Sequence, residues 1–217
     1  MADKRMRSAN FIPLLHDYFN QTRKPEGNLG KMMLKGMNSG HAKLADWGLG
    51  LLPKLSVQNA VDLGCGAGGN VAKLADKYDA HVTGVDYSEL SVEASKKTNA
   101  KAVKKGTVDI LAGDVSALDL PDSTYDLATA FETIYFWPGL EDCFKEVFRV
   151  LKDGGTFLIV NESDGTDRTA KAFQKIIDGM ELHTAEDIAE ALKAAGFSKV
   201  ESTHHKKKPW LTVVATK

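Results

Sequence analysis

The segment Val61-Asp-Leu-Gly-Cys-Gly-Ala-Gly-Gly-Asn70 constrains the fold of this chain more than any other feature. A run of β-forming residues leads directly into four glycines within six positions, and a helical pattern follows. Glycine adopts positive φ and lets the backbone approach a ligand without a Cβ in the way. A helix that starts after such a turn also offers free N–H groups. A turn that binds nothing would not need so many glycines, so the segment predicts a ligand-binding loop between a strand and a helix.

The rest of the chain repeats this order of strand and helix. Apolar runs and alternation with β-branched residues, bounded by Gly, Pro or Asp, predict strands at Val57–Leu63, His81–Asp86, Thr107–Ala112, Tyr125–Phe131 and Thr156–Asn161. The intervening helices are predicted at Asn70–Lys77, Glu89–Lys105 and Glu141–Leu151. Such alternation is typical of a doubly wound, mainly parallel sheet with helices on both faces.

The two ends of the chain differ from this pattern. Near the C-terminus, Thr184 is a candidate N-cap, and two strands, Ser198–Thr203 and Trp210–Thr216, are joined by a short polar loop. A short connection makes these strands antiparallel, so we expect a seven-stranded sheet that ends in a hairpin. Residues 1–55 have a helical pattern interrupted by glycines, which predicts a segmented N-terminal lid. The expected domains are therefore a lid at 1–55 and a sheet domain at 56–217.

Composition excludes several classes of protein. The 217 residues carry a net charge of −1, which gives no general attraction to nucleic acid, and no partner of that kind is expected. No apolar run is long enough to span a membrane, and the charged start MADKRMRSAN lacks the apolar region of a secretory signal. Cys65 and Cys143 are too few for a disulfide framework or a four-cysteine zinc site, so no metal centre is expected. We expect a cytoplasmic protein.

The glycine loop is compatible with two kinds of cofactor. Gly64-x-Gly66-x-x-Gly69 with Asp86 about 20 residues later fits the dinucleotide fingerprint of NAD(P)-dependent oxidoreductases. However, Val61 to Ala72 contains no Lys or Arg, and Asp62 lies at the strand end. A carboxylate repels a pyrophosphate but favours the sulfonium and ammonium groups of S-adenosylmethionine. The charge of the loop favours S-adenosylmethionine.

Further motifs follow the loop in order. They are Val82-Thr-Gly-Val-Asp86-Tyr-Ser, Gly113-Asp114-Val115, Leu120-Pro-Asp-Ser-Thr-Tyr-Asp-Leu127 and Phe148-Arg-Val-Leu-Lys-Asp-Gly-Gly155. With this set the chain resembles the class I S-adenosylmethionine-dependent methyltransferases, in particular the type 11 or UbiE-like branch that acts on small molecules. The resemblance implies S-adenosylmethionine as cofactor, S-adenosylhomocysteine as product and a small-molecule methyl acceptor. An oxidoreductase, or a binding module that has kept only the cofactor pocket, remains the alternative.

The resemblance also assigns residues to the cofactor. The methionine part is expected near Asp62, Gly64, Cys65, Gly66 and Asn70, and the ribose at Asp86 with Tyr87 and Ser88. Adenine is expected at Gly113, Asp114 and Val115, and Phe131 ends the fourth strand, where family members line the methyl-transfer channel.

The acceptor site has a weaker signal. The stretch Phe131-Glu-Thr-Ile-Tyr-Phe-Trp137 follows a strand, where open α/β sheets bind ligands. It differs from the Asn/Asp-Pro-Pro-Tyr motif of amino-group methyltransferases that act on adenine or glutamine, and no Pro-Cys nucleophile for carbon-5 methylation of pyrimidines is present. Glu132, Tyr135 and His41 are the catalytic candidates, as groups that position or deprotonate an acceptor. The pattern of Lys206–Lys208 predicts a solvated hairpin tip.

Overall fold

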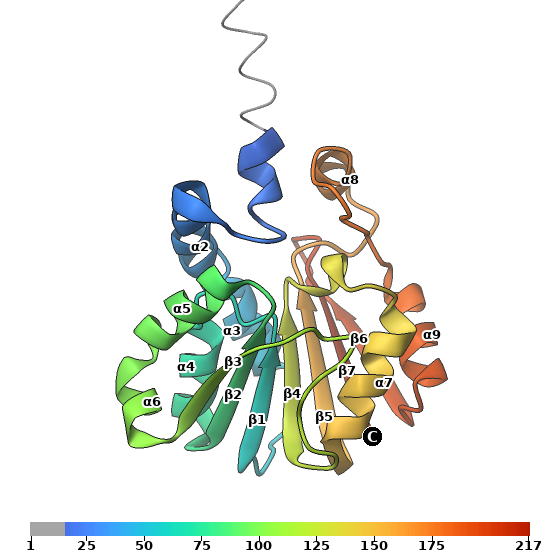
Figure 1. Cartoon of the computed structure of the whole chain (residues 1–217). Helices are drawn as coiled ribbons and strands as arrows, with labels where there is room; N and C mark the ends of the chain where they lie inside the picture. Colours follow the sequence, from blue (N-terminus) through green and yellow to red (C-terminus); the bar gives the residue numbers. More distant parts are fainter. Residues whose placement is uncertain (1–15) are drawn as a thin grey trace, which may run out of the picture.

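The computed structural model describes residues 16–217, and describes only the backbone at 37–40. Its sheet has the order β3-β2-β1-β4-β5-β7-β6. Strands β1 to β5 are parallel, whereas β7 runs antiparallel to both β5 and β6 (Figure 1). The strands are β1 Asn59–Leu63, β2 His81–Asp86, β3 Val108–Ala112, β4 Tyr125–Phe131, β5 Leu151–Asn161, β6 Lys199–His204 and β7 Leu211–Thr216. The predicted parallel sheet with a C-terminal hairpin is confirmed.

Helices cover both faces of the sheet. They are α2 Gly27–Gly40, α3 Ala42–Gly50, α4 Gly69–Tyr78, α5 Glu89–Thr98, α6 Ala100–Lys105, α7 Leu140–Val150, α8 Arg168–Gln174 and α9 Ala185–Ala194, with a 3-10 turn η1 at Ile134–Phe136. Apolar residues of α7 and α9 pack on one face of the sheet and form one hydrophobic core with it. Those of α3, α4 and α5 pack on the other face and form a second core. None of the helices in residues 16–217 is both long and apolar enough to cross a bilayer.

The predicted helix at 89–105 is in fact two helices, α5 and α6, separated at Asn99. The buried Asn99 side chain donates from Nδ2 to the carbonyl oxygens of Gly68 and Ser95, both at 3.0 Å. The break therefore ties the glycine loop to α5. Strand β5 also begins earlier than predicted, at Leu151, because an irregular pairing with β4 precedes its regular part at Thr156.

The prediction that glycines segment the N-terminal region was wrong for α2. This helix runs without a break through Gly30 and Gly36, and the helical pattern of residues 16–50 is interrupted at 21–26, before Gly27, and at residue 41, after Gly40. A Cβ at Gly30 would lie 2.7 Å from the Pro25 carbonyl carbon and 3.0 Å from Leu90 Cδ2. Gly30 therefore permits close packing of α2 against α5 and does not end the helix. Residues 1–15 of the predicted lid lie outside the described residues.

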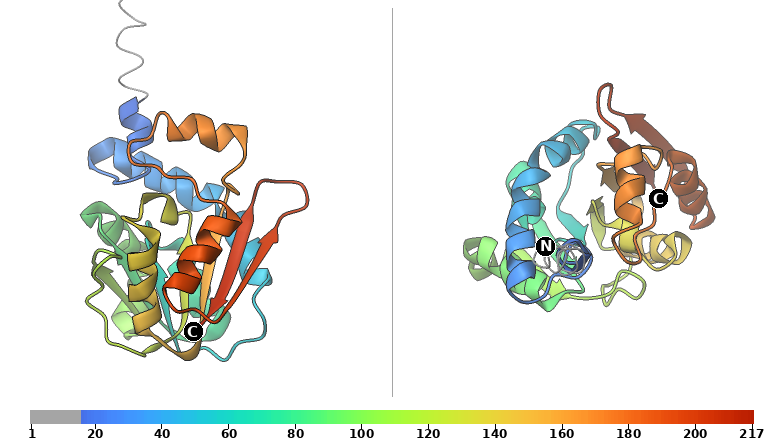
Figure 2. Two further views of the ribbon diagram at one scale, coloured as in Figure 1. Left: turned by 90° about the vertical axis from the view of Figure 1, so that its right-hand side faces the viewer. Right: turned by 90° about the horizontal axis from the view of Figure 1, so that it is seen from above.

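Two segments far apart in the sequence meet above the carboxyl ends of the parallel strands. The N-terminal segment before α2 lies beside α8 and the loop that follows it (Figure 2, blue and orange). The rings of Phe19 and Phe173 pack edge to face with their centroids 5.3 Å apart, and the Asp178 N–H donates to Asn20 Oδ1 at 2.8 Å. This contact forms a roof over the edge of the sheet where α/β proteins bind ligands.

Candidate cofactor and acceptor site

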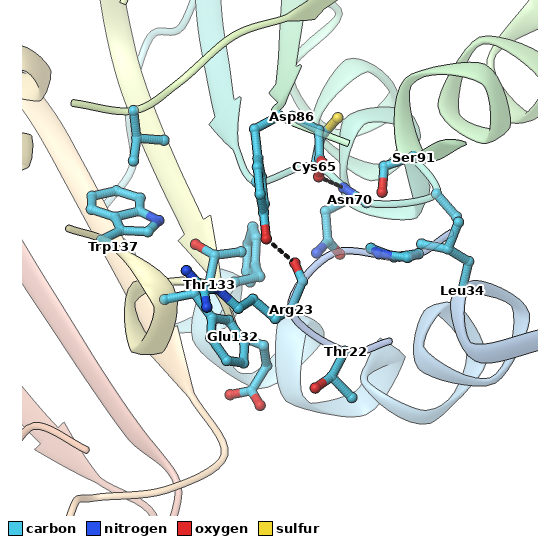
Figure 3. A pocket seen from close by; sticks show the side chains of 18 of the residues that line it. Thr22, Arg23, Leu34, Cys65, Asn70, Asp86, Ser91, Glu132, Thr133 and Trp137 are labelled. Carbon is cyan, nitrogen blue, oxygen red and sulfur yellow. Dashed lines mark hydrogen bonds between the residues drawn. The ribbon is translucent and has the colours of Figure 1, made fainter. Parts of the chain in front are cut away.

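A cavity of about 370 Å³ lies under this roof (Figure 3). We call the part formed by the ends of β1, β2 and β3 the cofactor half; it is lined by Gly64, Cys65, Gly66, Ala67, Asn70, Asp86, Tyr87, Ser91, Gly113, Asp114 and Val115. We call the part next to the aromatic stretch the acceptor half; it is lined by Phe131, Glu132, Thr133, Phe136, Trp137 and Pro138 at and after the end of β4 and by Thr22, Arg23 and His41. Pro25 and Leu34 line the cavity on the cofactor side, where Leu34 lies beside Asn70 and Ser91 (Figure 3). One continuous cavity therefore joins the glycine loop to the aromatic stretch.

The glycine loop needs its glycines. Gly64, Gly66 and Gly68 all have positive φ, between 52° and 78°. At Gly64 the space is also restricted, because a Cβ would lie 2.5 Å from Thr133 Cγ2. The Gly64 N–H donates to the Val85 carbonyl at 2.8 Å, which fixes the loop against β2. The backbone of the loop can thus approach a ligand closely.

Asp86 ends β2 at the floor of the cofactor half. Its Oδ2 accepts from the Gly66 N–H and its Oδ1 from the Ser88 N–H, both at 2.9 Å. Burial raises the pKa of this carboxyl, and the two backbone hydrogen bonds oppose the rise. The Ser91 hydroxyl also acts on this carboxyl and lowers its pKa, and the lone pairs that remain can accept from ribose hydroxyl groups.

Asp62 does not line the cavity. It is 2 % exposed behind the loop, where Thr129 Oγ1 donates to its Oδ1 at 2.7 Å. Burial raises the pKa of Asp62 to about 7. Cys65 does line the cavity, but burial raises the pKa of its thiol well above the usual value, which makes it a poor nucleophile.

The adenine candidates lie at the third strand end. The Gly113 N–H donates to the Asp86 carbonyl at 3.1 Å, so this turn is tied to β2. Asp114 accepts from the N–H and the hydroxyl of Ser116 at a single oxygen, Oδ1. Its other oxygen is thereby free to accept from an amino group.

Two residues predicted to lie near the ribose, Tyr87 and Ser88, also bond the N-terminal segment. Ser88 caps α5, lies outside the cavity lining, and donates from Oγ to the Pro25 carbonyl at 3.0 Å. Tyr87 lines the cavity, and its hydroxyl donates to the Arg23 carbonyl. Burial raises the pKa of Tyr87 to about 12. Both side chains therefore connect the end of β2 to the N-terminal segment.

Glu132 is the carboxyl residue that lines the acceptor half. Its backbone is left-handed, with φ of 60°, which is uncommon for a residue other than glycine. Its Oε1 accepts from the Tyr135 hydroxyl at 3.3 Å and from the Glu162 N–H. Burial raises the pKa of Glu132 to about 8, and the nearby Glu162 carboxylate acts in the same direction.

The other two catalytic candidates have different positions. Tyr135 is buried outside the cavity lining, where its hydroxyl donates to Glu132 and accepts from the Ser163 N–H at 3.2 Å. His41 lines the cavity, with Nε2 3.7 Å from Glu162 Oε2, and burial lowers its pKa. Sequence reasoning missed Glu162, Arg23 and Thr22, which belong to no recognisable motif and reach the site only through the fold.

Comparisons with known proteins show the family and the fold. Residues 61–159 match the family described as "Methyltransferase domain". The chain is 30 % identical over 161 residues to cycloartenol-C-24-methyltransferase 1 of Oryza sativa, which covers 70 % of this chain and 46 % of that protein. The chain spans less than half the length of the sterol methyltransferases it matches.

Two solved structures share the fold. A methyltransferase of Haloferax volcanii in complex with the Trm112 methyltransferase activator superimposes with a TM-score of 0.77 at 20 % identity, over 86 % of this chain and 94 % of that one. Phosphoethanolamine N-methyltransferase 2 of Haemonchus contortus, in complex with phosphomonomethylethanolamine and S-adenosylhomocysteine, gives 0.68 at 18 % identity, over 79 % and 52 %. The family match decides between the two interpretations of the glycine loop: residues 61–159 are a methyltransferase domain of the class I S-adenosylmethionine-dependent family.

Proposed function

We propose that this protein transfers the methyl group of S-adenosylmethionine to a small organic acceptor bound in the acceptor half. The observation that carries the proposal is the single cavity that joins the glycine loop to the aromatic wall of Phe136 and Trp137. When bound, the cofactor supplies a methyl group on a sulfonium, which is already activated. The protein then has to align the acceptor and exclude water, and alignment alone can contribute about 7–11 kcal/mol.

The cofactor half offers groups that match each part of S-adenosylmethionine. Asp86 is proposed to accept from the ribose hydroxyls, and Asp114 from the adenine amino group, with the Val115 N–H as donor. The methionine part is proposed to lie against the loop from Gly64 to Asn70, with the charge of Asp62 behind it. No Lys or Arg occurs in this loop, which suits the positive charges of the cofactor.

In the acceptor half, Glu132 and His41 are the proposed polar contacts to the acceptor. Tyr135 acts through Glu132: it is a positioning residue, because its hydroxyl binds the carboxyl group and lies outside the cavity. The aromatic side chains and the roof segment 22–25 exclude water. Relatives named as sterol and phosphoethanolamine methyltransferases act on small organic acceptors, which supports the same class here. We also propose a cytoplasmic location, in line with two free thiols.

A methyl-transfer assay tests this function. The full chain is incubated with S-adenosylmethionine labelled in the methyl group and a panel of small alcohols, phenols, amines and phosphorylated amines. We expect label in at least one acceptor, and loss of at least nine tenths of that transfer in Asp86→Ala. Transfer to no member of a broad panel, in a protein that binds S-adenosylhomocysteine, would favour the binding-module alternative.

A further inference from the structure

Three metal-ligating side chains converge at the acceptor end of the cavity. His41 directly precedes α3, Glu132 follows β4, and Glu162 follows β5. One ligand atom from each side chain lies within 4.8 Å of the other two. No short motif contains them, because each residue is brought to the site by a different element.

The charges of this group are not balanced by the surrounding protein. Among the described residues, Glu162 pairs with His41 alone, and Glu132 pairs with no lysine or arginine. Two carboxylates that face each other in a partly buried site repel unless one of them takes up a proton or a cation lies between them. A neutral imidazole cannot supply that charge, whereas a divalent cation can.

Glu132 is held as a metal ligand would be. Its Oε1 accepts from the Tyr135 hydroxyl and the Glu162 N–H, and Tyr135 is itself fixed by the Ser163 N–H. These bonds leave Oε2 as the atom that can face the cavity and the other two side chains. Hydrogen bonds of this kind orient the ligands of metal sites and are part of their affinity.

We propose that His41, Glu132 and Glu162 bind one divalent transition-metal ion, of which Mn²⁺ is the test case. One imidazole and two carboxylates form a donor set that suits Mn²⁺, Fe²⁺ or Zn²⁺ and not a soft monovalent ion. The 3.7 Å between His41 Nε2 and Glu162 Oε2 is close to the separation of two ligand atoms that share one ion at about 2.0–2.3 Å. The side chains of Glu162 and His41 are 58 % and 30 % exposed, so both can move inward.

The proposal also narrows the acceptor class, and this part rests on the proposed function. A cation at this position would coordinate an acceptor through oxygen and make a bound hydroxyl group more acidic. Acceptors with two adjacent oxygen ligands, such as a hydroxyl beside a carboxylate or phosphate, are then favoured over plain amines.

Binding of Mn²⁺ itself provides the test. The full chain, without a polyhistidine tag and treated with chelator, is titrated with Mn²⁺ by calorimetry and followed by electron paramagnetic resonance. We expect one Mn²⁺ per chain, and at least tenfold weaker binding in Glu162→Gln and in His41→Gln. The matched controls are Glu201→Gln and His204→Gln, which remove exposed side chains of β6; they should bind as the wild type does. Tyr135→Phe removes the hydrogen bonds of this hydroxyl to Glu132 and to the Ser163 N–H but no ligand atom, and should have a smaller effect.

Two results would overturn the proposal: no saturable binding, or stoichiometric binding that Glu162→Gln and His41→Gln leave unchanged. Circular dichroism on every variant excludes loss of the fold as the cause. S-adenosylhomocysteine binding is measured on the same samples, and we expect it within threefold of wild type, because Asp86 and the glycine loop are untouched. A protein that binds Mn²⁺ at this site but does not bind S-adenosylhomocysteine would contradict the proposed function and would still support the metal site.

Discussion

The cofactor half and the acceptor half of the cavity are built in different ways. The cofactor candidates lie on strands or just after their carboxyl ends, except Asn70 in the first turn of α4. The turns are bonded to one another through the backbone, as in the bond from the Gly64 N–H to the Val85 carbonyl. The acceptor half is assembled from three distant segments, around residues 22–41, 131–138 and 162. The strand order of the sheet positions the cofactor half. The acceptor half forms only when the roof and the loops pack over the sheet.

This difference makes an experimental distinction possible. Changes in the cofactor half should reduce cofactor affinity, because they distort the loop or remove a ligand of the ribose. Changes in the acceptor half should reduce turnover and leave cofactor affinity nearly intact. The four predictions below run from the largest expected effect to the smallest.

Gly64→Ala should have the largest effect. The residue has φ of 76°, and an added Cβ would meet Thr133 at 2.5 Å, so the loop must shift away from the cofactor. We expect at least about a hundredfold loss of affinity for S-adenosylhomocysteine, or roughly 2.7 kcal/mol. Gly106→Ala is the control, with φ of 75° but open space around the Cβ and a position outside the cavity. Affinity within threefold of wild type would contradict the assigned role of the loop.

Asp86→Ala should weaken cofactor binding at least tenfold without unfolding the protein. The carboxylate is the proposed acceptor of two ribose hydroxyls, and charged hydrogen bonds contribute about 1.5–3 kcal/mol each. Asp109→Ala, on the neighbouring strand and paired with His81, serves as the control. Unchanged affinity in a well-folded Asp86→Ala protein would remove the ribose assignment.

Tyr135→Phe tests the other half. Loss of the hydroxyl removes the hydrogen bond that positions the Glu132 carboxyl group. We therefore expect turnover to fall severalfold while the affinity for S-adenosylhomocysteine stays within twofold of wild type. Steady-state kinetics on an acceptor from the methyl-transfer panel, with calorimetry in parallel, separates the two quantities. Wild-type turnover would show that Tyr135 is only part of the core, and a parallel loss of cofactor affinity would mean that the two halves are not separable.

The buried Asp62 carboxyl predicts an effect on stability, with the smallest effect on cofactor binding. Its pKa in the folded protein is about 7, above the ordinary value of 3.8, so the unfolded chain loses this proton first as pH rises. Wild-type stability should therefore fall relative to Asp62→Asn between about pH 4 and pH 7, with a constant difference above that range. Thermal unfolding of both proteins across pH 4 to 9 measures this, and parallel curves would contradict the raised pKa.

The same contrast explains what could be predicted from the sequence. The glycine loop, the strand ends at Asp86 and Phe131, and the C-terminal hairpin follow from local patterns, and the structure has them at or within a few residues of the expected positions. The break at Asn99 could not be predicted, since it depends on a bond to Gly68 across the loop. Gly30 was misinterpreted as a helix break because its cause, packing on Leu90, lies in another helix. Glu162 carries no local signal, and only the fold brings it to His41.

The central claim is that the cofactor half binds S-adenosylmethionine and not a dinucleotide. Calorimetric titration of the full chain with S-adenosylhomocysteine, with NADH as a parallel ligand, tests it most directly. We predict micromolar, one-to-one binding of S-adenosylhomocysteine and no binding of NADH. Binding of NADH in its place would contradict the account, because the acidic loop would then accept the pyrophosphate that its charge should repel.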